Sequence, residues 1–417
     1  MARFSTFGEH FRGPTGTRQL MDDLGEVLTA ERPIMNLGGG NPGIIPAAQA
    51  RFREAMQRLL DDGRFDDIVA RYDGPQGYQP FRRELAKFLG RRYGWRVGEE
   101  NIAITSGSQG SFFSLFNMFT GPSPNGDPAC ILLPLTPEYI GYADISLHPG
   151  SVRSIKPTVE ITAPHEFKYH IDFAHLQLDD DVAAVCVSRP TNPTGNVITN
   201  NELTRLMVLT REAGVPLIVD NAYGQPFPDI VFVDAEPVFD DHVILCMSLS
   251  KLGLPGVRTG IIVAAPEIIH AVTGMNALSV LANGALGAGL VTDMVASGEI
   301  LTLAEQSVRP FYAAKCAAAR GWCHEAFAGV DYYLHKTEGA IFLWAWFPGL
   351  PISDLELYER LKARDVLVLA GRHFFPGLSE SWPHTGECLR ISYAQDEQEV
   401  RHGIAIIGEE VRRAFAR

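Results

Sequence analysis

Short apolar segments rich in β-branched residues recur between residues 100 and 265, and helical patterns separate several of them. Uninterrupted apolar runs of this length are typical of strands that are covered on both faces. The segments that predict such strands are Asn101–Thr105, Ala129–Leu135, Ala183–Ser188, Val215–Asp220, His242–Met247 and Gly260–Ala264. Helical stretches between them, such as Asn200–Ala213, predict an α/β fold with a mostly parallel sheet and helices on both faces.

The pattern changes after Ser307. A helical stretch extends to about Ala328, and the apolar segments GAIFLWAWF, VLVLA and LRISYA then predict strands, with a C-terminal helix from Asp396. This α+β pattern indicates a second, smaller domain. The first 45 residues show no sheet pattern, so we expect residues 46–305 to form the large domain, and residues 1–45 and 306–417 to form the small one.

Composition and charge narrow the class of protein. The chain has 417 residues, of which 46% are hydrophobic and 20% charged, so it has enough apolar surface to bury a core. A net charge of −13 argues against non-specific nucleic-acid binding, which needs a cationic surface. The six cysteines are scattered and form no Cys-x-x-Cys motif, which favours a reduced, cytoplasmic chain over a disulfide framework.

The segment Ala271–Thr292 contains no charged residue. Its glycines and asparagines make it a poor membrane span. We expect it to be buried in the protein or in a subunit interface, and we expect no membrane partner. The N-terminal segment MARFSTFGEHFRG lacks an apolar core of signal-peptide length.

Two familiar motifs are present but incomplete. Residues Gly38–Gly43 satisfy G-x-G-x-x-G, but the strand that a dinucleotide fold requires does not follow the helical pattern that begins near Pro46. We therefore expect a glycine-rich turn that lets the backbone approach a ligand. Residues His165–His170 resemble a zinc motif, but a spacing of five places the two imidazoles on different faces of a helix. We expect a solvated loop there and no metal.

Four polar segments follow predicted strands at their carboxyl ends, where α/β sheets place their ligands. They are Thr105–Gln109, Ser188–Gly195, Asp220–Tyr223 and Ser248–Lys251, the last followed by Arg258 seven residues on. The first is typical of a phosphate site, because a helix starts there with free N–H groups. Each segment also has an ordinary structural interpretation: a helix cap, an Asn-Pro turn, a buried charge with a cationic partner, and a solvated lysine.

In this order and spacing, the chain resembles the fold-type I pyridoxal-phosphate aminotransferases over essentially its whole length. The residues that carry the resemblance are Gly40-Asn41-Pro42, Tyr72-Asp73-Gly74-Pro75-Gln76-Gly77, Gly107-Ser108-Gln109, Pro137-Glu138-Tyr139, Asn192-Pro193-Thr194-Gly195, Asp220-Asn221-Ala222-Tyr223, Ser248-Leu249-Ser250-Lys251, Arg258 and Arg390. More narrowly, YDGPQG, PLTPEYIGYAD, VSRPTNPTGNVIT, IVDNAYGQPFP, LCMSLSKLGLPG and HFFPGL look like the valine–pyruvate aminotransferases. The resemblance implies a large domain with a mostly parallel seven-stranded sheet, a smaller α+β domain, and a homodimer with shared active sites.

The resemblance also implies pyridoxal 5′-phosphate as the cofactor and assigns its chemistry to residues at the strand ends. Lys251 would form the Schiff base and move a proton, and Asp220 would keep the pyridine nitrogen protonated. Asn192 and Tyr223 would hydrogen-bond the ring oxygen, and Tyr139 would stack on the ring.

Other residues would hold the phosphate and the substrate. The expected phosphate ligands are Ser108, Gln109, Ser248, Arg258 and, less directly, Ser250, with Tyr72 reaching the phosphate of the neighbouring subunit. Relatives often place the phosphate arginine eight residues after the lysine, and here the spacing is seven, so the loop must be tighter. The residues expected on the substrate side are Gly39, Gly40, Asn192 and Arg390. Arg390 would clamp the α-carboxylate with a bidentate fork, which lysine could not imitate.

The expected reaction is the reversible exchange of an amino group between L-valine and pyruvate, with small amino acids and 2-oxo acids as ligands. The segment Thr259–Val308 contains no lysine or arginine, so we expect no second cation there for a dicarboxylate substrate. One alternative is another enzyme on the same cofactor, such as a broad-specificity aminotransferase or a β-lyase. A non-enzymatic regulator is disfavoured, because too few residues precede Gly38 for a DNA-binding module.

Overall fold

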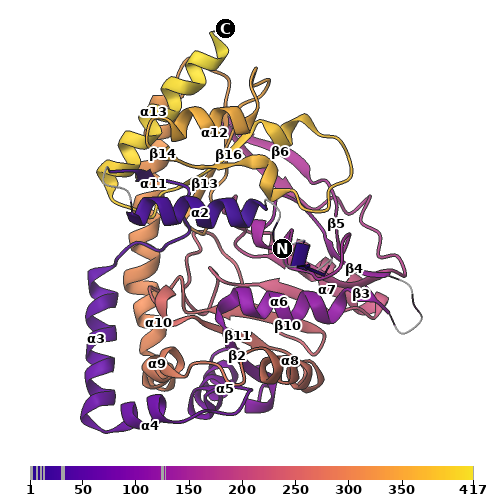
Figure 1. The fold of residues 1–417 in the computed structure, drawn as a ribbon, viewed down its shortest axis with the longest axis vertical. Helices are drawn as coiled ribbons and strands as arrows, with labels where there is room; N and C mark the ends of the chain where they lie inside the picture. The colour runs from indigo at the N-terminus through magenta and orange to yellow at the C-terminus, as the bar shows by residue number, and fades with distance from the viewer. Residues whose placement is uncertain are drawn as a thin grey trace.

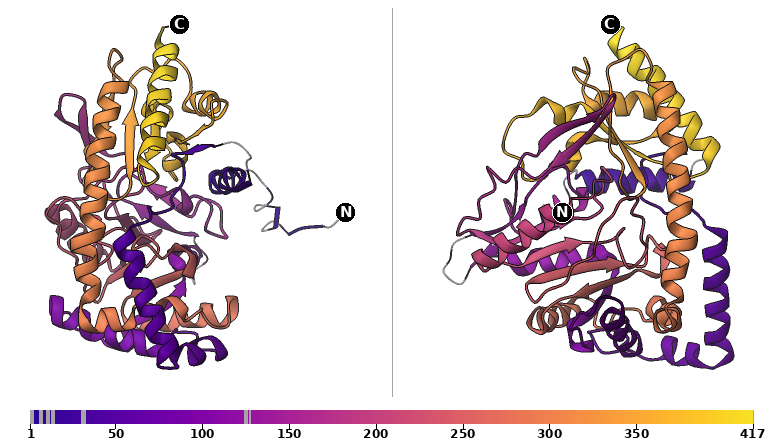
Figure 2. Two further views of the ribbon diagram at one scale, coloured as in Figure 1. Left: turned by 90° about the vertical axis from the view of Figure 1, so that its left-hand side faces the viewer. Right: turned by 180° about the vertical axis from the view of Figure 1, so that it is seen from behind.

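The computed structural model describes residues 3–5, 8–9, 12, 15–29, 33–123, 126 and 128–416. These residues form a lower part built on a central sheet and an upper part built on a second sheet (Figure 1). The long helix α11 (Arg309–Ala326) runs from the lower part to the upper one (Figures 1 and 2).

The central sheet follows the order β2-β11-β10-β9-β8-β4-β3, with β5 paired to β4. Its strands are β2 (Ile102–Ser106), β3 (Gly121–Pro122), β4 (Pro128–Leu133), β5 (Val152–Ser154), β8 (Val182–Ser188), β9 (Leu217–Asp220), β10 (Val243–Ser248) and β11 (Thr259–Val263). The pairs β4–β8, β8–β9 and β9–β10 are parallel, and β11 runs antiparallel between β10 and β2. The predicted α/β fold with a mostly parallel sheet is confirmed. The sheet has eight strands rather than the expected seven, because β5 and β3 are edge strands too short to show a pattern.

Helices cover both faces of this sheet, as the apolar runs predicted. Successive strand residues point to opposite faces. Ile218 and Ile244 pack with α6 (Gly107–Phe119), whereas Val219 and Leu245 belong to the larger core on the other face. The remaining helices of the lower part are α3 (Pro46–Asp61), α4 (Arg64–Ala70), α5 (Gln79–Tyr93), α7 (Asn200–Ala213), α8 (Pro266–Ser279), α9 (Leu286–Ser297) and α10 (Glu299–Leu303).

Local rules set the ends of α7, which has the predicted bounds. Thr199 Oγ1 accepts a hydrogen bond from the Glu202 amide at 3.1 Å, and Glu202 Oε2 accepts one from the Thr199 amide at 2.8 Å. This reciprocal capping box satisfies two N–H groups that the helix leaves unpaired. At the other end Gly214 has a φ of 69°, a left-handed conformation that glycine adopts without strain.

The second sheet follows the order β15-β16-β13-β12-β7-β6. Its strands are β6 (Thr158–Ala163), β7 (Glu166–His170), β12 (Tyr333–His335), β13 (Phe342–Trp346), β15 (Leu369–Ala370) and β16 (Cys388–Ser392). The helices α2 (Gly16–Thr29), α12 (Asp354–Lys362) and α13 (Glu397–Phe415) lie in the same upper part (Figure 1). The hairpin β6–β7 comes from within residues 46–305 and pairs with β12. The domain boundaries stay a prediction, and part of residues 1–45 lies outside the described residues.

The structure corrects two expectations from the sequence. Residues His165–His170 were expected to form a solvated loop, but Glu166–His170 is strand β7, in which Phe167, Lys168 and Tyr169 are buried. The alternation of Phe167 and Tyr169 is a strand pattern, and a distant carboxylate pairs with Lys168 between them. The first 45 residues do contain a strand, because β1 (Met35–Asn36) pairs with β14 (Val366–Leu367).

The uncharged segment Ala271–Thr292 spans the end of α8 and the start of α9. Val272 and Val291 are buried, whereas Leu278 is 92% exposed and Leu281 is 60% exposed. Among the described residues, no single helix is long and apolar enough to cross a membrane; one bent pair, Leu286–Ser297 with Glu299–Ala326, passes that test by length and composition alone.

Candidate active site

The predicted site residues come together at the carboxyl edge of the central sheet. Strand β9 ends at Asp220, which lies opposite Ser188 of β8 and Cys246 of β10. Lys251 follows the end of β10, and α6 begins directly after β2. Neighbouring parallel strands end at the same edge of a sheet, so the segments that follow them meet there.

Asp220 is a buried carboxylate with two hydrogen-bond donors. The Tyr142 hydroxyl donates to Oδ2 at 2.8 Å, and the Ala222 amide donates to Oδ1 at 3.0 Å. Burial raises the pKa of Asp220 to about 6, while these donors and the charge of Lys251 favour its ionised form. Asp220 is therefore suited to binding a cationic group of a ligand, because a positive charge close to the carboxylate would lower its pKa again and keep it ionised.

Lys251 presents an amine in the centre of the site. Its Nζ donates to the Gly40 carbonyl oxygen at 2.5 Å and lies 5.5 Å from the centre of the Tyr223 ring. Burial, followed by the positive charges of Arg390 and Arg258, lowers the pKa of Lys251 to about 8. A substantial fraction of this amine is therefore neutral near physiological pH, and a neutral amine is nucleophilic and can accept a proton.

Arg390, on β16 of the second sheet, is a buried guanidinium. Its Nη1 donates to Asn192 Oδ1 at 2.8 Å, and its Nη2 donates to the Gly38 carbonyl oxygen at 2.5 Å. The guanidinium carbon lies 4.1 Å from the centre of the Phe342 ring, and Nε is buried without a hydrogen-bond partner. Among the described residues no carboxylate pairs with Arg390. Burial lowers the pKa of Arg390 to about 10, so it stays charged and can bind an external carboxylate.

The start of α6 forms a cradle for an anion. No side chain caps this helix, so its first amides remain available. The Arg258 guanidinium lies over the same turn: a Cβ atom added to Gly107 would be 2.2 Å from Arg258 Nη2. Gly107 has a φ of 78°, so glycine provides both the backbone conformation and the space for the arginine. Ser108 and Gln109 lie in this first turn as predicted, and the tight seven-residue spacing does place Arg258 there.

The serines around Lys251 are buried next to this cradle. The Ser248 hydroxyl accepts a hydrogen bond from the Ser250 amide at 3.1 Å and donates to the Thr259 carbonyl oxygen at 3.4 Å. Their phosphate contacts stay a prediction, because the observed bonds of Ser248 hold the turn before Lys251.

Tyr139 contacts both the start of α6 and the aromatic residue that bonds to Asp220. Its hydroxyl donates to Gln109 Oε1 at 3.1 Å, and its ring meets that of Tyr142 edge-on at 5.4 Å. A cavity of about 370 Å³ opens beside Gln109 and Gly141, between α2 and α6. Tyr223 packs edge-on against Phe342 at 6.1 Å, so it borders both Lys251 and the aromatic bed under Arg390.

Two predicted positions differ from the others. Tyr72 is 85% exposed, so its proposed contact with a neighbouring subunit stays a prediction. Gly39 donates its amide to Asn36 Oδ1, and the carbonyl groups that contact Arg390 and Lys251 belong to Gly38 and Gly40. Gly38 was missed as a site residue, although it lies in the glycine-rich turn expected to approach a ligand.

Sequence reasoning also missed the polar network behind Asp220. The Glu138 carboxyl is buried, with Oε1 accepting from the Ser188 amide at 2.8 Å and Oε2 accepting from the Ser188 hydroxyl at 2.5 Å. The Tyr142 hydroxyl lies 3.3 Å from that serine and donates to Asp220. Burial raises the pKa of Glu138 to about 8. The spacing Glu138-x-x-x-Tyr142 was visible, but only the fold shows that both side chains turn inward.

These residues fit pyridoxal 5′-phosphate. Three features of the described structure match its three functional parts: an uncapped helix start under Arg258 for the phosphate, a buried Asp220 for the ring nitrogen, and the Lys251 amine for the aldehyde. The buried Arg390, with Nε unpartnered, matches the α-carboxylate of an amino acid. The fold and site thus define a pyridoxal-phosphate enzyme that binds amino acids.

Comparison with known proteins agrees with this class. The family model of the class I and II aminotransferases matches residues 32–407. The valine–pyruvate aminotransferase of Escherichia coli (strain K12) is 45% identical over 413 residues, which is 99% of either chain. The crystal structure of valine–pyruvate aminotransferase from Salmonella typhimurium LT2 has a TM-score of 0.89 at 43% identity, and covers 96% of this chain and 99% of that one. A mutant aspartate aminotransferase of Thermus thermophilus, at 19% identity, shares the fold alone, with a TM-score of 0.76 over 98% of this chain and 100% of that one.

The chain belongs to the class I and II aminotransferases. It is an aminotransferase of fold type I that uses pyridoxal 5′-phosphate, and its substrates are amino acids and 2-oxo acids.

Proposed function

We propose that this enzyme exchanges the amino group between L-valine and pyruvate, giving 3-methyl-2-oxobutanoate and L-alanine. The observation that carries the proposal is the buried guanidinium of Arg390, held by Asn192 and the Gly38 carbonyl. It accounts for one carboxylate, which valine, alanine and their oxo acids all possess. The activity of the Escherichia coli relative, 45% identical over 99% of the chain, supports the same substrates.

When bound, pyridoxal phosphate carries the amino group between the two substrates and withdraws the electron pair that is left at the substrate Cα. Lys251 holds the cofactor between turnovers and moves a proton to or from the substrate Cα, because its lowered pKa leaves a neutral amine available. Asp220 orients the ring by its charge, with Tyr142 and the Ala222 amide holding its two oxygens in place.

The remaining residues position the reacting groups. The start of α6 and Arg258 bind the phosphate, and Tyr139 packs beside the ring. The roles proposed for Asn192 and Tyr223 are hydrogen bonds to the ring oxygen of the cofactor. Asn192 Oδ1 also accepts a hydrogen bond from Arg390 Nη1. Phe342 and the partly buried Tyr139 exclude water from this side of the site, which strengthens the pairing of Arg390 with a carboxylate.

An aliphatic side chain suits the site better than a second carboxylate. A carboxylate without a cationic partner costs several kcal/mol in a closed site. The segment Thr259–Val308, which follows the Schiff-base lysine, has no lysine or arginine to offer from a second subunit. Valine and alanine differ by two methyl groups, so we expect discrimination of about 1–3 kcal/mol per methylene, with valine favoured.

We propose further that the active unit is a homodimer with shared sites. Tyr72, Leu278 and Leu281 are exposed on the single chain, and a partner subunit that contacts them would cover their apolar surface. All six cysteines are buried free thiols, which supports a reducing, cytoplasmic location.

The test of the proposed reaction is a comparison of kcat/KM for valine, alanine, isoleucine, aspartate and glutamate as donors. Pyruvate is the acceptor for all of them except alanine, which is paired with 3-methyl-2-oxobutanoate. We expect valine with pyruvate to be among the best pairs. A tenfold preference for aspartate or glutamate would instead identify a broad-specificity aminotransferase, and release of a substituent from Cβ of the amino acid would identify a β-lyase.

A further inference from the structure

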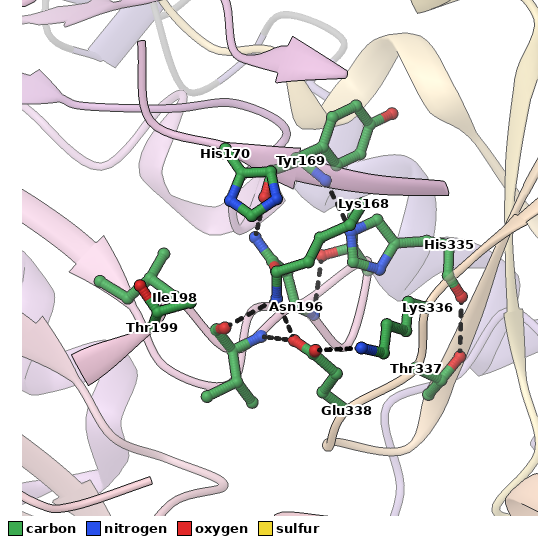
Figure 3. A network of polar contacts seen from close by, with 12 residues as sticks. Lys168, Tyr169, His170, Asn196, Ile198, Thr199, His335, Lys336, Thr337 and Glu338 are labelled. Carbon is green, nitrogen blue, oxygen red and sulfur yellow. Dashed lines mark hydrogen bonds and ion pairs between the residues drawn. The ribbon is translucent and has the colours of Figure 1, made fainter. Parts of the chain in front are cut away.

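Two opposite charges meet in the interior outside the site: Lys168 on β7 and Glu338 between β12 and β13 (Figure 3). Each residue is 5% exposed, and Lys168 Nζ donates to Glu338 Oε2. A buried ion pair adds little net stability, because the loss of hydration offsets the attraction. Its better-attested effect is to select one arrangement of the groups around it. The groups that contact Lys168 and Glu338 therefore show which arrangement the ion pair selects.

Both charged side chains hold the loop 191–197, which follows β8 and presents Asn192. Lys168 Nζ donates to Asn196 Oδ1 and to the Val197 carbonyl oxygen, each at 3.0 Å. Glu338 Oε2 accepts from the Val197 amide at 3.1 Å, and the Glu338 amide donates to the Gly195 carbonyl oxygen at 3.0 Å. The contacts around Asn196 and Glu338 are visible side by side in Figure 3.

Backbone hydrogen bonds within the loop connect the residues that Lys168 and Glu338 contact to the segment that carries Asn192. The Thr191 amide donates to the Asn196 carbonyl oxygen, and the Gly195 amide donates to the Thr191 carbonyl oxygen, both at 2.8 Å. Gly195 has a φ of 69°, and an added Cβ would lie 2.6 Å from the Gly339 carbonyl oxygen. The loop therefore packs closely against the segment of Glu338, and the backbone next to Asn192 is bonded to the residues that Lys168 and Glu338 hold.

We propose that Lys168 and Glu338 are positioning residues, which hold the loop 191–197 from the second sheet so that Asn192 stays against Arg390. Through this contact the pair sets the affinity of the site for the substrate α-carboxylate. Asn192 Oδ1 holds one arm of Arg390, and Arg390 lies on β16 of the same sheet that contributes Lys168. The inference rests on the proposed function in one respect, that the ligand of Arg390 is a carboxylate.

The variant that tests this removes both charges together, Lys168→Met with Glu338→Gln. Removing Glu338 alone would leave the Lys168 ammonium buried without its carboxylate, which is strongly destabilising. Removing Lys168 alone would leave Glu338 paired with the partly exposed Lys336, whose Nζ lies 3.5 Å from Glu338 Oε1. The double variant preserves side-chain volume but withdraws the donors to Asn196 and Val197. The matched control is Arg364→Met with Glu410→Gln, an ion pair at 2.9 Å whose carboxylate is equally buried, between α13 and the residues before β14.

The measurement on the holoenzyme is the dissociation constant of 3-methylbutanoate, which has the carbon skeleton of valine but no amino group to react. We expect binding to weaken about 10-fold in the double variant, with KM for valine and pyruvate rising similarly and kcat changing less than about threefold. The control should bind within twofold of the parent. A second variant, Asn196→Ala, leaves the ion pair intact and removes the bond from Lys168 to Asn196 Oδ1, together with the bond from Asn196 Nδ2 to the Tyr169 carbonyl oxygen. It should weaken binding in the same direction, by less than the double variant.

The outcomes separate the two proposals. Unchanged affinity in a folded double variant, or in Asn196→Ala if the double variant does not fold, overturns the positioning role. A parent enzyme that binds no monocarboxylate overturns it as well. A third outcome is that the parent enzyme binds 3-methylbutanoate and that removal of the ion pair lowers this affinity, while the parent transfers no amino group from valine to pyruvate. That outcome would support the positioning role and contradict the proposed function.

Discussion

Arg390 Nη1 lies 2.8 Å from Asn192 Oδ1, although the two residues are 198 positions apart. Arg390 lies on β16 of the second sheet, and Asn192 follows β8 of the central sheet. The contact joins a residue proposed to touch the cofactor ring to a residue proposed to bind the substrate carboxylate. The other arm of Arg390 is held by the Gly38 carbonyl, two residues from the carbonyl that accepts from Lys251. Three distant segments of the chain thus set the position of one guanidinium.

Replacing Arg390 by lysine should impair substrate binding while leaving the cofactor in place. An ammonium cannot bind Asn192, Gly38 and a carboxylate with one planar fork, and the lost charge-assisted bonds correspond to about 1.5–3 kcal/mol, or roughly 10–100-fold in kcat/KM. Steady-state kinetics with valine and pyruvate, together with the cofactor absorbance spectrum, measure this. A kcat/KM within twofold of the parent would show that Arg390 does not bind the carboxylate.

Covalent capture of the cofactor by the apoprotein should depend on pH with a midpoint near 8. Burial and the charges of Arg390 and Arg258 lower the pKa of Lys251 to about 8, so the reactive neutral amine forms below the usual range of lysine, 10.5. The rate of absorbance change after adding pyridoxal phosphate should rise with pH, reach half of its maximum near pH 8 and level off about one pH unit higher. Borohydride reduction followed by peptide mapping should label Lys251. Labelling of another lysine, or a midpoint near 10.5, would contradict the assignment.

Glu138→Gln should stabilise the apoprotein at alkaline pH. Burial raises the pKa of Glu138 to about 8 from 4.5, so between these values the unfolded chain releases a proton that the folded chain keeps. The contribution of Glu138 to stability therefore falls as pH rises from 4.5 to 8, and glutamine removes that loss. We expect the Tm of the variant to exceed that of the parent by about 2–6 °C at pH 8.5, and by less at pH 5. An equal difference at both pH values would mean that Glu138 does not titrate in this window.

Gly107→Ala should weaken cofactor binding about 10-fold, since one charge-assisted contact is worth about 1.5–3 kcal/mol. The new Cβ would be 2.2 Å from Arg258 Nη2, so the flexible arginine has to leave the start of α6, and alanine is also strained at the φ of 78° that Gly107 adopts. Gly110→Ala is the matched control on the same helix, because its Cβ meets nothing nearer than 3.7 Å. Titration of each apoprotein with pyridoxal phosphate gives the dissociation constants. Equal affinities in both variants would remove Arg258 from the phosphate site.

Co-expression of Tyr72→Phe chains with Lys251→Ala chains should restore activity through mixed dimers. Tyr72 is 85% exposed on its own chain, in keeping with a role in the site of a partner. One of the two sites in a mixed dimer would then have both an intact lysine and an intact tyrosine. Purified mixed dimers, selected with two different affinity tags, should exceed both parents in activity. No gain over the parents would place Tyr72 within its own subunit.

Much of the site was visible in the sequence because its residues follow strands whose apolar pattern is strong. Asp220 ends one buried strand and Lys251 lies three residues after the end of another. Their grouping into one site came from the resemblance of the chain to the aminotransferases. The burial of Lys168 was not predicted, because its carboxylate partner Glu338 is 170 positions away. The burial of Glu138 was not predicted for the same reason, because the groups that donate hydrogen bonds to its carboxyl belong mainly to Ser188, which is distant in the sequence.

The sequence by itself determined the α/β class, the ends of α7 and the four polar segments at the carboxyl ends of strands, because these follow from local periodicity, capping and chain order. Only the tertiary structure decided that the hairpin of β6 and β7 joins the second sheet, that Gly38 rather than Gly39 holds Arg390, and that Lys168 and Glu338 hold the loop of Asn192. Those contacts join residues far apart in the chain. Their energies depend on burial and on the partner that each charge meets, and a linear pattern of residues does not record either of these.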